Sequence, residues 1–316
     1  MRFPLADWID THTDCRYNFG SSGMYGVARP PSPTPAELRS ASEPELRRGL
    51  GALLGVAPSR VFLTHGATEA NAWALLYLGR GRKGRCRVQY PEYPPLVEVA
   101  RRAGFRISTG PGACALAVVS RPRNPVGDLW SPDRLDAWSR GARAILVDET
   151  FREFTAAPSA QRLARRGLWS TGSFTKAYGA DDVRVGFVVP PEEATERFAR
   201  FHGLVSDEMP TYSVASALAL LSRRERYLAS VRAIFGRNRD AWRRANPGAP
   251  DLAAPVAFDD PVPRGGDRFA RRCLLASVLV SPGSFFGRSS GVRVGLTRRS
   301  FPVDLAQYIR VRSAAH

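Results

Sequence analysis

The chain has 316 residues, 44% of them hydrophobic and 10% aromatic, a composition that is typical of a globular protein with a packed core and excludes a disordered chain. The formal net charge is +17, and since only two of the 46 basic residues are lysine, the charge comes from arginines dispersed singly and in pairs; compositional bias accounts for this better than nucleic-acid binding. No run approaches 18 consecutive apolar residues and the N-terminus lacks the apolar segment of a signal peptide, so we expect a cytoplasmic protein without a membrane span.

The first 44 residues are rich in proline, glycine and serine, most of all from Arg29 to Pro35. This composition disfavours long helices and indicates an arm. Short apolar runs then alternate with helical segments up to about residue 189. The expected strands are 61–63, 87–90, 115–119, 144–147, 168–173 and 185–189, and the expected helices include 67–78 and 94–103. The alternation predicts an α/β fold with a mostly parallel central sheet and helices on both faces.

The pattern becomes helical after Pro190-Pro191 and stays so to about residue 244. Expected strands at 279–281 and 292–296 then form a short α+β segment. We therefore expect a large domain over 45–205 and a smaller α+β domain. The smaller domain combines the arm, 1–44, with the connecting helices and C-terminal segment, 206–316.

One of the two lysines, Lys176, lies in the hydroxyl-rich segment Ser-Phe-Thr-Lys-Ala-Tyr-Gly, just after the expected strand 168–173. Arginine cannot act as an amine nucleophile, whereas lysine can form a Schiff base once its pKa is lowered. A chain that uses arginine almost everywhere but has lysine here suggests a chemical role for this amine.

Four further motifs follow expected strands. Gly66-Ala67-Thr68 opens a helix, and helix N-termini bind phosphate groups. Tyr93 offers an aromatic face, Asn124 begins Asn-Pro-Val-Gly, and Asp148 ends a strand that would be buried on both faces. Each has a plain structural interpretation as packing, an Asn-Pro turn or a turn aspartate. Because open α/β sheets bind ligands at the carboxyl ends of their strands, we expect the motifs to form one site.

Together these motifs resemble the fold-type I pyridoxal-phosphate enzymes of the class I/II aminotransferase family, and most closely the histidinol-phosphate aminotransferase branch. The resemblance runs from about residue 18 to 296 and includes Ser-Phe-Thr-Lys with Arg-Val-Gly at 173–186 and Pro-Gly-Ser-Phe-Phe-Gly at 282–287. It implies pyridoxal 5'-phosphate as cofactor, Lys176 as its Schiff-base lysine, and Asp148 as the carboxylate that keeps the pyridine nitrogen protonated.

The resemblance also implies the remaining binding residues. Asn124 and Phe151 would lie at the cofactor's phenolate oxygen, and Tyr93 would stack on its ring. The phosphate would be held by Gly66, Ala67, Thr68, Ser173 and Arg184. Arg293, in Arg-Val-Gly-Leu, would pair with the substrate α-carboxylate, with Asn124 and Gly20 beside it.

Three departures from the family pattern bear on the reaction. Phe151 replaces a tyrosine whose hydroxyl lies near the phenolate oxygen in most members, and some members that decarboxylate also have phenylalanine there. The segment 40–47 lacks the tyrosine that reaches the neighbouring subunit's phosphate, for which Tyr25 is a substitute candidate. Asp181 and Asp182 stand in a stretch that is apolar and glycine-rich in the family.

We expect an aminotransferase that acts on an L-amino acid and a 2-oxo acid in specialised metabolism. The alternative is another pyridoxal-phosphate reaction on an amino acid, such as decarboxylation or β- or γ-elimination or replacement. A DNA-binding regulator on this fold would carry a winged-helix domain, and about 60 residues before the first core strand leave little room for one.

The family implies a homodimer, and the four dispersed cysteines predict no metal site. Aromatic candidates for the substrate side chain are Tyr17, Tyr25, Trp73, Tyr178 and Tyr212.

Overall fold

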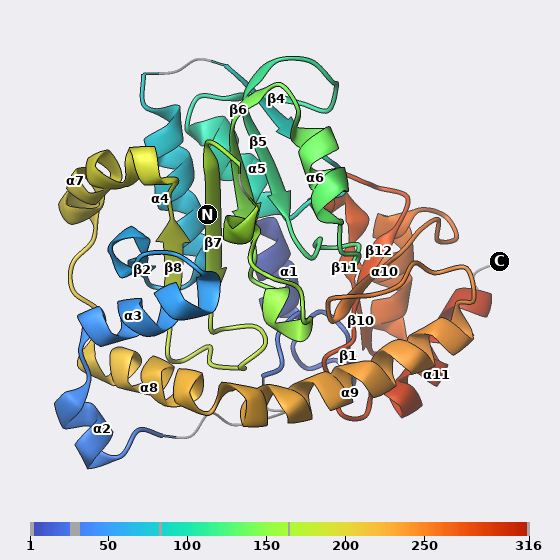
Figure 1. Ribbon diagram of the computed structural model, residues 1–316. Coiled ribbons are helices and arrows are strands. Elements are labelled where there is room, and N and C mark those ends of the chain that lie inside the picture. Colours follow the sequence, from blue (N-terminus) through green and yellow to red (C-terminus); the bar gives the residue numbers. More distant parts are fainter. Residues whose placement is uncertain (1–2, 26–31, 82–83, 164, 315–316) are drawn as a thin grey trace.

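A seven-stranded sheet forms the centre of the computed structural model, which describes residues 3–25, 32–81, 84–163 and 165–314 (Figure 1). The strand order is β2-β8-β7-β6-β5-β3-β4. Strand β8 is antiparallel to both neighbours, and the other neighbouring pairs are parallel, which confirms the expected mostly parallel sheet. The strands are β2 Phe62–Thr64, β3 Arg85–Val88, β4 Arg106–Ser108, β5 Cys114–Ser120, β6 Ala142–Asp148, β7 Leu168–Ser173 and β8 Gly186–Val189.

The sheet is buried on both faces, as its continuous apolar runs predict. In β5, Leu116 and Val118 join one core cluster, which includes residues of helices α4 (Ala67–Gly79), α5 (Pro94–Arg102) and α7 (Thr195–Val205). Ala117 and Val119 point to the other face and pack with Leu135 of α6 (Pro132–Ser139). Each fully buried valine or leucine contributes about 1.5–3 kcal/mol relative to an exposed side chain. This alternation fixes the register and thus brings the carboxyl ends of β5, β6 and β7 to one edge.

Two glycines allow α4 to begin close to that edge. Gly66 precedes the helix with φ of 90°, in the region that favours glycine. Gly186, the first residue of β8, pairs with Thr64 of β2. A Cβ on Gly186 would lie 2.4 Å from the carbonyl carbon of Gly66, so a side chain there would push the helix N-terminus away.

The C-terminal part of the chain forms a three-stranded antiparallel sheet in the order β11-β12-β9, from Ser281–Pro282, Val292–Gly295 and Val256–Asp259. Helix α9, Arg224–Ala245, follows α8, Thr211–Ser222, and runs from the large sheet to this small one (Figure 1). The remaining helices here are α10, Gly266–Leu275, and α11, Phe301–Ser313. The division into domains at residues 44 and 205 stays a prediction.

The N-terminal arm packs against the small sheet. It forms α1 (Pro4–Thr11) and the two-residue strand β1 (Tyr17–Asn18), which pairs with β10 (Val278–Leu279). The amide of Gly295 in β12 donates to the Phe19 carbonyl at 2.7 Å. The single strand expected at 279–281 is in fact divided, because β10 pairs with the arm while β11 pairs with β12. Residues 26–31, which include the first three residues of the proline-rich run, lie outside the described residues.

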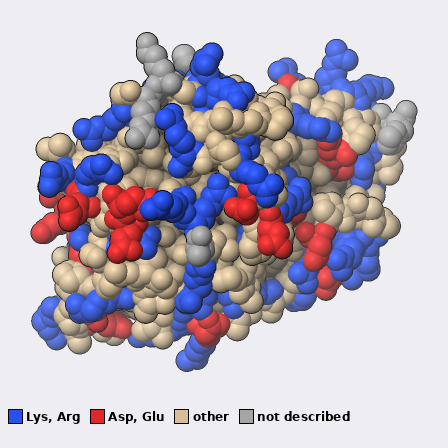
Figure 2. Space-filling model, turned by 45° about the horizontal axis from the view of Figure 1, so that its top comes forward, with Lys and Arg blue, Asp and Glu red and all other residues tan. Residues whose placement is uncertain are grey.

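Shorter elements complete the chain. Helices α2, Pro35–Ser40, and α3, Glu43–Leu54, lead into the large sheet. Single 3₁₀ turns are η1 Pro58–Arg60, η2 Arg152–Phe154, η3 Ala160–Arg162, η4 Glu192–Ala194 and η5 Gly283–Phe286. Among the described residues no helix has both the length and the apolar character that crossing a membrane requires. Figure 2 shows one face of the molecule, on which basic side chains are scattered and acidic ones lie between them.

Candidate active site

A pocket lies where the carboxyl ends of β5, β6 and β7 meet the N-terminus of α4. Its lining residues are Tyr25, Ala67, Thr68, Tyr93, Ser120, Pro122, Asn124, Asp148, Thr150, Phe151, Thr175, Lys176, Asp181 and Arg184. Eight of the twelve residues expected in the site line it. The other four, Gly20, Gly66, Ser173 and Arg293, are not among its lining residues, and their contacts with neighbouring residues are described below.

Asp148 is held at the end of β6 by two hydrogen bonds. The Asn71 side-chain amide donates to one carboxylate oxygen at 2.8 Å, and the Thr150 backbone amide donates to the other at 2.9 Å. Asn71 is itself oriented by the Thr171 hydroxyl, which donates to its side-chain oxygen at 2.6 Å. Burial raises the pKa of Asp148, although these hydrogen bonds and Lys176 act in the opposite direction. A buried carboxylate of this kind favours a cationic partner.

Sequence reasoning missed Asn71. The available signal was its spacing, since Asn71 lies four residues after Ala67 and therefore on the same face of α4 as that pocket residue. A buried asparagine is ordinarily interpreted as a helix packing residue. Only the fold shows that this face of α4 meets the end of β6.

Lys176 follows β7, and its amine contacts the N-terminal arm. Lys176 Nζ donates to the Tyr25 hydroxyl at 3.0 Å, and the Met24 amide donates to the Lys176 carbonyl at 2.9 Å. The Tyr25 ring lies so close to Gly23 that a Cβ there would be 2.4 Å from Tyr25 Cζ. Burial acts to lower the pKa of the lysine, but the Tyr25 and Tyr93 oxygens outweigh it and the pKa is raised. Tyr25 is thus a direct neighbour of the amine in its own chain.

Another part of the pocket gathers groups that suit an anion. The backbone amides of Ala67 and Thr68 open α4, where the helix dipole favours negative charge. The Arg184 guanidinium donates to the His65 carbonyl at 3.3 Å, next to this N-terminus. Arg184 also pairs with Asp181 at 3.1 Å, so one of the two unexpected acids lies in the pocket and opposes an anion there.

The Ser173 and Thr175 hydroxyls, 2.8 Å apart, are linked just before Lys176. Thr150 Oγ1 is buried without a hydrogen-bond partner among the described residues, although its residue lines the pocket. With an anion site, a buried carboxylate, an aromatic ring and an amine, the pocket fits an elongated ligand. Such a ligand would have an anionic group, a flat ring with a basic atom, and a group that reacts with amines.

Arg293, on the central strand β12 of the small sheet, is 2% exposed. Its guanidinium donates to the Asn124 side-chain oxygen at 3.3 Å, to the Gly20 carbonyl at 2.7 Å and to the Ser281 hydroxyl at 3.4 Å. Its Nε is buried and has no partner among the described residues. Burial lowers the pKa of Arg293 to about 10, so it remains a cation at neutral pH. Asn124 thus joins the small sheet to the pocket.

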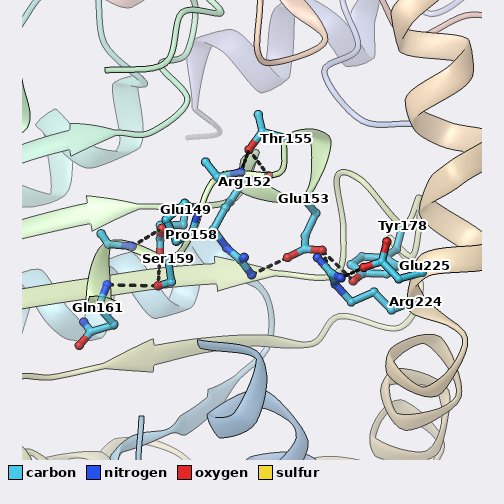
Figure 3. A network of polar contacts seen from close by, with 12 residues as sticks. Glu149, Arg152, Glu153, Thr155, Pro158, Ser159, Gln161, Tyr178, Arg224 and Glu225 are labelled. Carbon is cyan, nitrogen blue, oxygen red and sulfur yellow. Dashed lines mark hydrogen bonds and ion pairs between the residues drawn. The ribbon is translucent and has the colours of Figure 1, made fainter. Parts of the chain in front are cut away.

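A polar network links the turn η2, which follows β6, to Tyr178 in the segment after β7 and to Arg224 of α9 (Figure 3). Glu153, on the turn η2, pairs with Arg152 and accepts from Arg224 of α9 at 2.8 Å and from the Tyr178 hydroxyl at 3.2 Å. Tyr178 therefore ties the lysine segment to the turn after β6. It does not line the pocket, and of the five aromatic candidates for the substrate side chain Tyr25 alone is a lining residue.

The chain matches the family model for class I and II aminotransferases over residues 38–299. It is 26% identical to capreomycidine synthase from Streptomyces vinaceus, with 93% of this chain and 89% of that protein covered. Threonine-phosphate decarboxylase from Pseudomonas aeruginosa is 29% identical, with 98% and 92% covered. Histidinol-phosphate aminotransferase 2 from Caulobacter vibrioides is 30% identical over 50% of this chain and 51% of its own. Aspartate aminotransferase from Thermus thermophilus with maleate has the same fold, with a TM-score of 0.81 at 18% identity over 98% and 97% of the two chains.

Proposed function

Because the chain belongs to the class I and II aminotransferase family, whose cofactor is pyridoxal 5'-phosphate, we propose that it transfers an amino group between an L-amino acid and a 2-oxo acid. The observation that carries this proposal is the contact of Arg293 with Asn124, which brings a buried cation next to the pocket that contains Lys176. A cation there suits a substrate carboxylate, and the amine suits proton transfer at the adjacent carbon.

The pocket residues fit this cofactor. Ala67, Thr68 and Arg184 would hold its phosphate, together with the Ser173 hydroxyl, which lies behind the lining residue Thr175. Asp148 would face its ring nitrogen, and Tyr93 would cover its ring. Lys176 is the amine that would bind its aldehyde. Since its pKa is raised here and not lowered as the sequence suggested, the amine must first lose its proton. When bound, the cofactor supplies an electron-accepting ring that allows a bond at the substrate's α-carbon to break.

The side chains around Lys176 favour breaking the Cα–H bond. Arg293 would form a charge-assisted pair with the substrate carboxylate and keep that group in place through the reaction, and Asn124 would fix the direction of this pair. Lys176 Nζ would accept the α-proton of the substrate and later donate it to complete the transfer. Tyr25, which accepts a hydrogen bond from the Lys176 amine, would hold the amine in place during both proton transfers.

Decarboxylation is the second candidate, and the Phe151 side chain favours it. Phe151 is 3% exposed and presents no hydroxyl to the pocket, and threonine-phosphate decarboxylase is among the relatives that match nearly the whole chain. In that reaction the carboxylate must leave, so a firm hold on it by Arg293 would oppose the chemistry. The buried, hydrogen-bonded position of Arg293 therefore supports transamination.

The two reactions differ in the bond that breaks, and an isotope experiment separates them. The holoenzyme is incubated in D₂O with a panel of L-amino acids and a 2-oxo acid acceptor. Transamination produces a new 2-oxo acid, and it exchanges the α-hydrogen of the donor with solvent. Release of CO₂ with the α-hydrogen retained in an amine product would instead establish decarboxylation.

We expect Arg293→Lys to raise KM for both substrates by about 10- to 100-fold, because lysine keeps the charge but cannot form the two-pronged pair with a carboxylate. The matched control is Arg243→Lys, since Arg243 is an exposed arginine that pairs with Asp251 on the surface. Steady-state kinetics with varied donor and acceptor test this. An unchanged KM would mean that another group binds the carboxylate.

Tyr25→Phe should lower kcat by about tenfold, because it removes the hydrogen bond between the Tyr25 hydroxyl and the Lys176 amine but keeps the ring in the pocket. The matched control is Tyr212→Phe, since Tyr212 is a half-exposed tyrosine on α8. Single-turnover rates of α-hydrogen exchange report the proton-transfer step directly. If exchange keeps its wild-type rate while kcat falls, Tyr25 acts on a different step.

A further inference from the structure

Glu92 is a fully buried carboxylate beside the pocket, in the loop between β3 and α5, and none of the roles above uses it. Three donors converge on it. The backbone amide of Tyr93 donates to Oε1 at 2.6 Å, the backbone amide of Ser120 donates to Oε2 at 3.0 Å, and the Ser120 hydroxyl donates to Oε1 at 2.5 Å. Tyr93 and Ser120 both line the pocket.

A chain of hydrogen bonds leads from Glu92 to the buried arginine of the small sheet. The Ser120 oxygen accepts from the Asn124 backbone amide at 2.8 Å, and the Asn124 side chain accepts from Arg293 at 3.3 Å. A second connection runs through Phe286, whose carbonyl accepts from the Glu92 amide at 3.2 Å and whose ring lies 5.1 Å from the Arg293 guanidinium. Glu92 is thus joined by two routes to the residues proposed to hold the substrate carboxylate.

The charge of Glu92 decides which way the Ser120 hydroxyl points. An ionised carboxylate accepts from all three donors, so the hydroxyl proton faces Glu92 and its oxygen remains free for the Asn124 amide. A protonated Glu92 needs an acceptor for its own proton. The two backbone amides that face it can only donate, so neither can be that acceptor. The Ser120 oxygen would then accept from both Glu92 and the Asn124 amide, and its own proton would have to turn away from Glu92 and find a new acceptor in a buried site.

We propose that Glu92 is a positioning residue of this site, whose ionised carboxylate orients Ser120 and through it holds Asn124 and Arg293 in the geometry that binds a carboxylate substrate. This rests on the proposed function of Asn124 and Arg293. Glu92 itself touches neither substrate nor cofactor in this scheme.

The titration of Glu92 falls in an accessible range. Burial raises the pKa of Glu92 to about 7, and the hydrogen bonds from Ser120 and Tyr93 act against this rise. The charged group that faces it is Arg123, which also acts to lower this pKa and whose guanidinium donates to the Pro91 carbonyl at 3.0 Å. The segment that carries Phe286 contacts Glu92 through the Phe286 carbonyl, and among the described residues Arg123 is the charged group that acts on the pKa of Glu92. The positioning is therefore lost as the pH falls through about 7.

The main test measures KM and kcat of the holoenzyme between pH 5.5 and 8. In the wild type we expect KM for the amino donor to rise about tenfold on going from pH 8 to pH 6, the size of one lost buried hydrogen bond. Glu92→Gln should show the raised KM at every pH in this range, with kcat within about threefold of the wild type. A wild-type pH profile in Glu92→Gln would overturn the proposal.

Ser120→Ala provides a second, independent variant. It breaks the link to Asn124 but leaves Glu92 its two backbone donors, so it should also raise KM and abolish the pH dependence. The double variant should be no worse than either single one, because both remove the same connection. Effects that multiply would show that Glu92 does not act through Ser120.

Two measurements on the apoprotein separate this inference from the proposed reaction. Asn124 would also lie at the cofactor's phenolate oxygen, so cofactor affinity, followed by fluorescence, should weaken below about pH 7 in the wild type and lose that dependence in Glu92→Gln. A raised folded-state pKa also means that the wild type loses stability relative to Glu92→Gln as the pH rises from 4.5 through 7. If transamination fails but both patterns appear, the role of Glu92 stands. If transamination holds and neither appears, that role is wrong.

Discussion

Lys176→Ala is expected to abolish covalent binding of the cofactor and to lower kcat/KM by about 10⁴-fold, the upper range for losing a positioned acid–base group. Lys176 is the one lysine among the pocket's lining residues, and its amine is held by the Tyr25 hydroxyl. No other lining side chain offers a primary amine. Borohydride reduction makes the bond between cofactor and lysine permanent, so mass spectrometry of a digest identifies the modified residue.

The near absence of lysine makes this experiment unusually direct. The chain contains one other lysine, Lys83, which lies outside the described residues, and Lys83→Ala is the natural control. The label should appear on the Lys176 peptide in the wild type and in Lys83→Ala, and on no peptide in Lys176→Ala. A label on Lys83, or full activity without Lys176, would refute the assignment.

Local patterns were sufficient to predict the central sheet. The run from Ala115 to Val119 is apolar at every position, and a strand must be covered on both faces to bury such a run. The structure has β5 there, with alternate residues in two core clusters. Strands of the C-terminal part were harder to predict, since β9 and β10 are four and two residues long and are defined by partners far away in the sequence.

Part of the site could also be predicted from local patterns, and part depends on contacts between distant segments. Residues in motifs at strand ends, such as Asp148 and Lys176, were found because β6 and β7 are neighbours and place them at one edge. The hydrogen bonds of Asn71 to Asp148 and of Lys176 to Tyr25 were not predicted, because each joins segments that are far apart in the sequence. Glu92 was missed because its sequence neighbours resemble an ordinary loop, and only the fold brings Ser120 against it.

Replacing Asp148 by asparagine should lower activity and raise stability of the apoprotein. Asparagine has the same shape, and Asn71 can turn over to accept from the new amide while the Thr171 hydroxyl reverses. Without the negative charge the cofactor's ring nitrogen loses its counter-ion. We expect kcat to fall by about 10⁴-fold, the order seen when an amide replaces a carboxylate that orients a catalytic ring. Rates of α-hydrogen exchange by the holoenzyme measure this loss.

The stability effect has the opposite sign because burial raises the pKa of Asp148. A group whose folded-state pKa is raised contributes stability below its unfolded value, about 3.9, and this stability is lost as the pH rises through the folded pKa. At pH 7 the wild-type apoprotein therefore bears an ionisation cost that Asp148→Asn lacks, so the variant should have the higher Tm. The difference should shrink toward pH 4, and Asp251→Asn, at an exposed ion pair, is the surface control. A variant less stable than the wild type at every pH would mean that the hydrogen bonds to Asn71 and Thr150 outweigh burial, and that Asp148 is ionised in the apoprotein without penalty.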